Sequence, residues 1–319
     1  MSPYHPPLRP TPPHSMSAVS PQTITPLGVP AVSPSPLMFP LSAEEITAQV
    51  RVALLEDEAF NDVSTVATVV SGRHVRCAIV SRRDGVISGV AMAVEAFKQL
   101  DPNISIRVDA DDGTRVRGGT TVMVLSGHAR GILSAERTAL NYMQHLSGIA
   151  SLTWKFVQAI EGTNAQILDT RKTTPGWRHL EKFAVRCGGG LNHRMDLRSG
   201  VLIKDNHLAA IGGDIATAVS RARQLALPGT PVQVECDTID QVEAAVAAGA
   251  DWVLLDNMSP ERLRDAVQRC AGRCITEASG GVSLDTVRAI AETGVDRISI
   301  GALTHSAPAL DLGLDFDGL

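Results

Sequence analysis

Residues 232–257, VQVECDTIDQVEAAVAAGADWVLLDN, decide the fold of this chain. Two short apolar runs, VQVEC and WVLLD, flank a helical stretch that opens at Thr238, a favourable capping residue, and closes at Gly249. A buried strand, a helix and a second buried strand are the repeating unit of a parallel sheet with right-handed crossovers. Both runs also end in carboxylates, Glu235 in the first and Asp256 in the second. The stretch therefore predicts parallel strands whose carboxyl ends carry polar side chains.

The same alternation recurs on both sides of this stretch. Further apolar runs that end in polar residues are AQILDTRK, VLIKDNH, CITEASGG and RISIGAL, and the later ones are separated by helical stretches that begin with serine, SPERLRDAVQRC and SLDTVRAIAETG. Six such strands could form an open sheet or a barrel. No GxGxxG motif follows the first strand, which disfavours a dinucleotide-binding sheet. Polar residues at the end of strand after strand favour a barrel, because those ends meet at one mouth. A seventh strand is expected near residues 185–191.

The residues before the barrel predict a smaller α+β unit with a tail ahead of it. Ser42 and Glu45 form a capping box at the start of a helix, and a second helix, AMAVEAFKQL, lies among the strand-like runs HVRCAIVSR, GVISGV, ISIRVDA and TVMVLSGHA. A strongly helical pattern then begins at Ser134. Residues 1–40 contain twelve of the eighteen prolines and no acidic residue, and they lack a continuous apolar segment. We expect them to form a disordered or extended tail rather than an export signal.

Composition excludes several classes of protein. The chain has 319 residues, 44% of them hydrophobic and 20% charged, which is enough for one large domain or two ordinary ones. No apolar run is long enough to span a membrane. The sequence pI near 6.0 argues against a general nucleic-acid-binding protein. The five cysteines contain no CxxC pair, so we expect reduced thiols, most of them in the core of a cytoplasmic protein.

Positive charge is concentrated in one segment. Between Arg171 and Lys204 there are eight lysines and arginines and only two acidic residues, a formal charge of +6 in a chain whose net charge is −5. Arginine forks bind carboxylates and phosphates through paired hydrogen bonds. A dense cationic cluster repels itself unless an anion occupies it, so this segment predicts a site for a small polyanion. The residues of this cluster are Arg171, Lys172, His193, Arg194 and Lys204.

Two further features fit the same site, although each has a structural alternative. The SGG of Ser279, Gly280 and Gly281 and the glycine at 301 resemble a phosphate cradle, or they are two tight turns. Glu235 and the Asp256 carboxylate could hold Mg²⁺ through oxygen ligands, bind sugar hydroxyls, or simply balance nearby cations.

Taken in order, the motifs resemble one enzyme family. DTRKTTPG, RCGGGLNHR, LIKDNH, VECD, LLDN, SGG and LTHSAPALDLGLDF are similar to those of the quinolinate phosphoribosyltransferases, and SAERTALNYMQHLSGIAS resembles the family helix that leads into the barrel. The likeness extends from about residue 41 to residue 316. Asn61, Ser64 and Trp177 depart from the usual family residues.

The resemblance implies an α/β fold made of a small N-terminal α/β sandwich domain and an incomplete, six- or seven-stranded α/β barrel. The implied boundaries are a proline-rich tail at 1–40, the sandwich at 41–145, the barrel at 146–303 and a C-terminal segment at 304–319 that returns to the sandwich. The implied reaction transfers phosphoribosyl from phosphoribosyl pyrophosphate to quinolinate, with Mg²⁺, and yields nicotinate mononucleotide, pyrophosphate and CO₂ on the de novo route to NAD. The resemblance also implies a cytoplasmic homodimer or larger homo-oligomer.

The resemblance assigns roles to thirteen residues. Arg171, Arg194, His193 and Lys204 would bind the two carboxylates of quinolinate, helped by Arg137 from the neighbouring subunit. Lys172 would face phosphate or pyrophosphate, and Thr170 is a further substrate-binding residue. The remaining assignments are a 5′-phosphate cradle of Ser279, Gly280, Gly281 and Gly301, ribose or magnesium ligands at Glu235 and Asp256, and a catalytic set of Lys172, Lys204, Glu235 and Asp256.

Three other functions remain open at this point. A relative on the same scaffold could use another pyridine or purine acceptor, or could be the molybdenum-associated paralogue. A Schiff-base lyase could use Lys172 or Lys204 as its amine. A phosphate-binding protein without enzymatic activity would need the glycine turns but not the pair of carboxylates opposite the cations.

Overall fold

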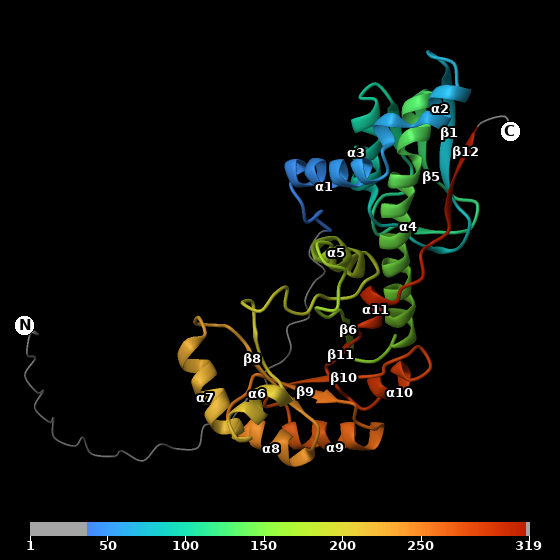
Figure 1. The fold of residues 1–319 in the computed structure, drawn as a ribbon. Coiled ribbons are helices and arrows are strands. Elements are labelled where there is room, and N and C mark those ends of the chain that lie inside the picture. The colour runs from blue at the N-terminus through green and yellow to red at the C-terminus, as the bar shows by residue number, and fades with distance from the viewer. Residues whose placement is uncertain (1–36, 317–319) are drawn as a thin grey trace, which may run out of the picture.

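The computed structural model describes residues 37–316, which form an N-terminal part and a C-terminal part joined by one long helix (Figure 1). The tail expected over residues 1–40 lies, up to residue 36, outside the described residues. Buried apolar side chains form one continuous cluster from Val50 near the N-terminal end to Leu312 near the C-terminal end. No helix within the described residues is long and apolar enough to cross a membrane.

The N-terminal part is a small antiparallel sheet covered by helices. Ser42 accepts the backbone N–H of Glu45, and the Glu45 carboxylate accepts the backbone N–H of Ser42, so the predicted capping box is present at the first helix. The central strand of the sheet pairs with antiparallel neighbours on both sides, in the order β12-β1-β5-β3. The elements are α1 (Ala43–Glu56), η1 (Ala59–Asn61), α2 (Val63–Thr68), β1 (His74–Ser81), β2 (Gly85–Val86), α3 (Val90–Leu100), β3 (Ser105–Val108), β4 (Arg115–Val116) and β5 (Thr121–His128).

Helix α4 (Ala129–Ala159) connects the two parts. It begins five residues before the predicted start at Ser134, because the apolar positions on its buried face already include Ala129 and Ile132. The helix packs against α3 at one end and against the first barrel elements at the other (Figure 1). Residues on α4 are thus placed in both parts of the molecule.

The C-terminal part is a parallel sheet of six strands in the order β6-β11-β10-β9-β8-β7. The first strand of this sheet in chain order, β6, therefore pairs with the last, β11, as in a barrel, but β6 and β7 at the two edges do not pair with each other. The predicted fold class is confirmed as a mixed α/β structure with an unclosed barrel. The elements are β6 (Gln166–Leu168), α5 (Arg178–Cys187), β7 (Val201–Ile203), α6 (Asp205–Ala210), α7 (Ile215–Leu225), β8 (Val232–Cys236), α8 (Ile239–Ala247), β9 (Trp252–Asp256), α9 (Pro260–Cys270), β10 (Ile275–Ser279), α10 (Val287–Ala291), β11 (Arg297–Ser299) and α11 (Ala302–His305).

Two expectations about local structure were wrong. The seventh strand near 185–191 is absent, because α5 continues to Cys187, and the only sheet contact there is a single parallel bridge between Leu168 and Leu191. The helix expected from Ser283 also begins later than predicted, because the chain turns first and α10 starts at Val287.

The chain ends by returning to the N-terminal sheet. Strand β12 (Leu312–Phe316) pairs antiparallel with β1, with Cys77 opposite Phe316 and Ser81 opposite Leu312. This pairing ties the end of the barrel part to the sandwich part and helps to fix their relative position (Figure 1). All five cysteines lie within the described residues, and four of them are buried.

Candidate active site

The carboxyl ends of the six parallel strands surround a pocket of about 780 Å³. A volume of this size is typical of a small-molecule site. Twelve of the thirteen predicted residues line it, namely Thr170, Arg171, Lys172, His193, Arg194, Lys204, Glu235, Asp256, Ser279, Gly280, Gly281 and Gly301. Arg137 does not. It lies exposed on α4 in the N-terminal part.

The order of the strands divides the mouth of the pocket into three sectors. A cationic sector spans the open edge between β6 and β7 and contains Arg171, Arg194 and Lys204. A carboxylate sector on the next two strands contains Glu235 and Asp256. The glycine turns after β10 and β11 form the third sector and return to β6. The pocket thus offers separate places for carboxylates, a sugar and a phosphate.

The cations of the first sector lie close enough to repel one another. Burial lowers the pKa of Arg194, and the positive charge of Arg171 lowers it further. The Arg194 guanidinium donates from Nη1 to the carbonyl oxygen of Gly200 at 2.9 Å, which leaves its other N–H groups free of this bond. The buried Nε of Arg171 has no hydrogen-bond partner in the described structure. An anion placed between these two arginines would relieve both the repulsion and the unsatisfied donor.

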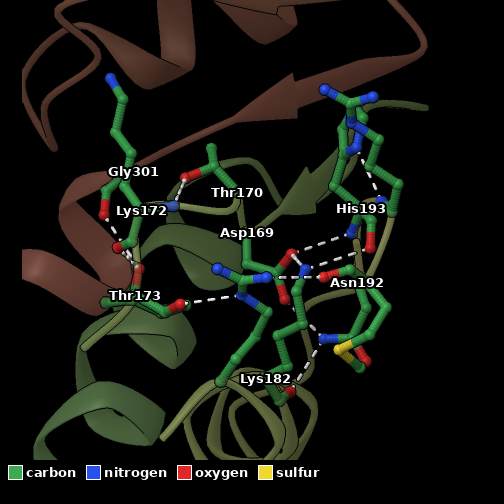
Figure 2. Close-up of polar contacts among 12 residues, drawn as sticks. Asp169, Thr170, Lys172, Thr173, Lys182, Asn192, His193 and Gly301 are labelled. Atoms are coloured by element: carbon green, nitrogen blue, oxygen red, sulfur yellow. Dashed lines mark hydrogen bonds and ion pairs between the residues drawn. The ribbon is translucent and has the colours of Figure 1, made fainter. Parts of the chain in front are cut away.

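A buried ion pair positions the loop that carries Arg194. Lys182 on α5 pairs with Asp169 after β6, and both side chains are almost fully buried, with exposures of 1% and 0% (Figure 2). Asp169 also accepts the Asn192 amide at 2.6 Å and the backbone N–H of His193 at 2.9 Å. Lys182 donates to the carbonyl of His193 at 3.1 Å. This group, which we call the Asp169–Lys182 brace, holds residues 192–194 against β6.

The three glycines before this loop allow α5 to approach α4. A Cβ atom on Gly188 would lie 2.3 Å from the backbone oxygen of Ala150 and 2.7 Å from Cβ of Thr153. No side chain fits there without moving backbone. Gly188 and Gly190 of RCGGGLNHR therefore serve packing against α4, while the residues after them serve the pocket.

The carboxylate sector pairs with the cationic one. Glu235 accepts the Lys204 ammonium at 2.8 Å. Burial raises the pKa of Asp256, and the negative charges of Glu235 and Asp237 raise it further. A bound cation would offset this repulsion, so the donor set fits Mg²⁺ held through carboxylate oxygens, with water and substrate oxygens completing its shell. Within residues 37–316 there is no group of three or more His, Cys, Asp or Glu that could hold a metal ion without such additional ligands.

The turn after β10 is fixed by close backbone contact. Gly280 has φ of +93°, and a Cβ atom there would lie 2.2 Å from Oδ1 of Asn257. Asn257 in turn donates from Nδ2 to Asp256 at 2.6 Å and from its backbone to Ser279 at 2.9 Å. The glycine turn and the Asp256 carboxylate thus form one unit. Lys172 extends past Gly301, away from the Asp169–Lys182 brace, toward the same sector (Figure 2).

The floor of the pocket is polar, and the residues that form it were not among the predicted site residues. Glu277 is fully buried, and its Oε2 lies 2.9 Å from the Gln233 amide and 3.2 Å from Nε2 of His193. Burial acts to raise the pKa of Glu277, but the hydrogen bonds from His193, Ser299 and Gln233 together with the charge of His193 outweigh it and hold the pKa below its ordinary value. The alternation along β8 and β10 could have revealed this, because Gln233 and Glu277 lie two residues before pocket residues that were identified.

An unclosed α/β barrel whose mouth holds arginines, paired carboxylates and glycine turns defines an enzyme for small, multiply charged anions. Residues 149–315 match the family described as "Quinolinate phosphoribosyl transferase, C-terminal domain", and residues 62–147 match its N-terminal domain. The chain belongs to the quinolinate phosphoribosyl transferase family. The family and the phosphoribosyltransferase activity predicted from the motifs are therefore confirmed.

Individual relatives agree along nearly their whole length. The chain is 44% identical to the "Nicotinate-nucleotide pyrophosphorylase [carboxylating]" of Mycobacterium leprae, over 83% of this chain and 95% of that protein. It is 41% identical to a probable enzyme of the same name from Bacillus subtilis, over 82% and 90%. The solved nicotinate-nucleotide pyrophosphorylase of Francisella tularensis has a TM-score of 0.82 and 39% identity, and covers 88% of this chain and 99% of its own.

Proposed function

We propose that this pocket transfers the phosphoribosyl group of phosphoribosyl pyrophosphate to quinolinate with loss of CO₂, releasing nicotinate mononucleotide and pyrophosphate. The observation that carries the proposal is the meeting of Arg171, Arg194 and Lys204 at one edge of a pocket whose other edges hold carboxylates and glycine turns. Both substrates are polyanions of the charge and size that such a site would accept.

The cationic sector would bind quinolinate. Each arginine fork can hold one carboxylate through two N–H bonds, and a hydrogen bond to a charged group is worth about 1.5–3 kcal/mol. The unsatisfied Nε of Arg171 supports this placement. Lys204 lies at the border with the carboxylate sector through its pair with Glu235, so its ammonium is placed to contact both substrates.

The other two sectors would bind the phosphoribosyl donor. The backbone N–H groups of the turns at 279–281 and 301 would take the 5′-phosphate, with Thr170 and Lys172 beside them. Glu235 and Asp256 would bind the ribose hydroxyls or hold Mg²⁺. The metal ion would neutralise charge on the departing pyrophosphate.

The side chains of the pocket then contribute mainly by holding the two substrates in position rather than by reacting with them. As pyrophosphate leaves, positive charge develops at C1 of the ribose, and the pyridine nitrogen, held in line, forms the new bond. The positive ring nitrogen that results draws the electron pair left when the neighbouring carboxylate departs as CO₂. Lys172 and Lys204 supply nearby positive charge that stabilises the ring carbanion. A proton then replaces the lost carboxylate on the ring carbon.

A homodimer would complete the site. Arg137 is exposed on α4, and the surface near it is apolar, since Val52, Val63 and Val66 on α1 and α2 are more than half exposed. The hydroxyl of Ser134 donates to Asp62 at 2.9 Å and so joins α2 to the turn of α4 that carries Arg137. Exposed apolar area of this kind is typical of an interface between subunits. We propose that Arg137 reaches the pocket of a partner subunit.

The Schiff-base alternative is less consistent with the geometry. Such a lysine must be an uncharged amine, whereas Lys204 forms an ion pair with Glu235. The direct test is mass spectrometry of the products after incubation with quinolinate, phosphoribosyl pyrophosphate and magnesium. We expect nicotinate mononucleotide and CO₂ in equal amounts. When nicotinate replaces quinolinate, we expect no release of CO₂. Failure to form the mononucleotide at saturating substrates would exclude the proposed reaction.

A further inference from the structure

The barrel floor contains a buried carboxylate for which the proposed function gives no role. Glu277 lies on β10 with no exposed surface, and its Oε2 faces Gln233 and His193, with the Ser299 hydroxyl as a further hydrogen-bond partner of the carboxylate. On the neighbouring strand β11, opposite Glu277 in the register, the Arg297 guanidinium stacks on the Trp252 ring at 3.8 Å, and its Nε is buried without a hydrogen-bond partner. Burying a charge is costly, so a carboxylate retained at this position is expected to act on a neighbouring group.

His193 connects Glu277 to the cationic sector. The backbone N–H of Arg194 donates to Nδ1 of His193 at 2.7 Å, which requires a lone pair on Nδ1. From these partners the proton of the imidazole is assigned to Nε2, where it faces Oε2 of Glu277 at 3.2 Å and Oε1 of Gln233 at the same distance. Both ring nitrogens are thus engaged within the chain, and neither is free to bind a substrate carboxylate.

We propose that Glu277 is a positioning residue for quinolinate binding, acting through His193 on the backbone of Arg194. Glu277 accepts the Nε2 proton and so fixes the tautomer and the orientation of the ring. The ring then accepts the Arg194 N–H and fixes the start of that side chain, whose guanidinium faces the pocket. We call this series the Glu277–His193–Arg194 relay. It rests on the proposed function only for the identity of the anion that Arg194 binds.

The relay and the Asp169–Lys182 brace hold the same loop from two directions. The brace fixes the backbone N–H and carbonyl of His193, and the relay fixes its ring. With both in place, the arginine has few conformations left to lose when its ligand binds, which favours affinity. In this account His193 has a positioning role, which differs from the direct carboxylate contact expected from the sequence.

The test compares three single variants by their KM for each substrate. Glu277→Gln removes the charge but keeps the shape, and we expect it to raise the quinolinate KM about tenfold, which corresponds to about 1.4 kcal/mol, with the phosphoribosyl pyrophosphate KM within about twofold of the parent. His193→Asn keeps an acceptor for the Arg194 N–H at the place of Nδ1, so its quinolinate KM should stay within about threefold. His193→Ala should match or exceed the effect of Glu277→Gln.

A double variant identifies the relay. Once His193 is replaced by Asn, the carboxylate has no ring left to orient, so adding Glu277→Gln should change the quinolinate KM by less than about twofold. The matched control is Asp101→Asn, which removes a carboxylate 2.8 Å from His128 in the N-terminal part and should leave both KM values unchanged.

Several outcomes would overturn the relay. An unchanged quinolinate KM for Glu277→Gln, or an equal rise in both KM values, would show that the carboxylate is only structural. A loss in His193→Asn as large as in His193→Ala would show that the ring contacts the substrate, and this comparison stands even where Glu277→Gln fails to fold. ¹⁵N NMR of the imidazole reads the relay without substrate. We expect an unprotonated Nδ1 in the parent, and a protonated Nδ1 would contradict the relay, whereas absence of product formation by the parent would contradict only the proposed function.

Discussion

Replacing Lys182 by Met tests whether the brace supports the site. The side chain of Lys182 is 1% exposed and that of its partner Asp169 is 0% exposed, so the variant leaves a carboxylate buried beside an apolar side chain. Breaking a buried ion pair from one side costs about 3–5 kcal/mol. Methionine has nearly the volume of lysine, so little of that cost would come from a cavity. We expect the free energy of unfolding to fall by about 3–5 kcal/mol.

The loss of stability in Lys182→Met should also depend on pH in a definite direction. Burial already raises the pKa of Asp169 and lowers the pKa of Lys182. The attraction between the two groups opposes both shifts, and for Asp169 the hydrogen bonds from Asn192 and His193 oppose it as well. Without the lysine, Asp169 keeps a raised pKa, so its contribution to stability is present below about pH 4 and is lost as the pH rises through the folded pKa. The deficit of the variant relative to the parent should therefore be larger at pH 8 than at pH 5.

Urea unfolding followed by circular dichroism measures this effect. Lys155→Met on the exposed face of α4 is the matched control and should change stability by less than about 0.5 kcal/mol. Combining Lys182→Met with Asp169→Asn removes both charges and should recover at least about 1 kcal/mol of the loss. A loss below about 1 kcal/mol in Lys182→Met, or a double variant less stable than either single one, would refute the reasoning.

Four further predictions concern the pocket, the N-terminal part and the subunit contact. Arg194→Ala should raise the quinolinate KM by about 10- to 100-fold through loss of a charge-assisted bond, with an unchanged thermal unfolding midpoint; saturation at parental concentrations would contradict its role. Gly280→Ala should raise the phosphoribosyl pyrophosphate KM more than about tenfold, because its φ of +93° and the lack of space for Cβ distort the turn; a parental KM would exclude the turn from the phosphate site. Burial raises the pKa of Asp112 to about 6, so the stability that this carboxyl contributes below about pH 4 is lost as the pH rises through about 6. Asp112→Asn should therefore raise the free energy of unfolding by about 1–2 kcal/mol at pH 7 and leave it unchanged at pH 4, as measured by urea unfolding at both pH values. An equal effect at the two pH values would contradict this prediction. Inactive Arg137→Ala and Lys204→Ala chains, mixed and allowed to exchange subunits, should regain about a quarter of parental activity if each pocket takes one residue from each chain; exchange without recovery would exclude a shared site.

The barrel could be predicted because its signals are local. Each strand is a short apolar run with a polar end, and parallel strands bring those ends together, so the pocket residues from Arg171 to Gly301 were found from spacing and residue type. The seventh strand failed for a related reason. Leu180, Phe183, Ala184 and Cys187 repeat at helical spacing, and this periodicity extends α5 through the segment that looked like a strand.

The brace and the polar floor of the pocket could not be predicted from the sequence. Lys182 was one of eight cations in its segment, and nothing local distinguishes a buried lysine from an exposed one. Its burial depends on Asp169, which comes from a different element. Glu277 was visible at a strand end, but its partner Gln233 is 44 residues away and becomes a neighbour only when the sheet forms. Non-local pairs of this kind require the fold to be known.

The most direct test of the central claim is a crystal structure of the protein soaked with quinolinate. The account predicts that the pyridine ring lies in the pocket with one carboxylate within hydrogen-bond distance of Arg171 and the other within that distance of Arg194, with the ring nitrogen facing the carboxylate sector. Quinolinate bound at the glycine turns, or at a surface away from both arginines, would contradict it.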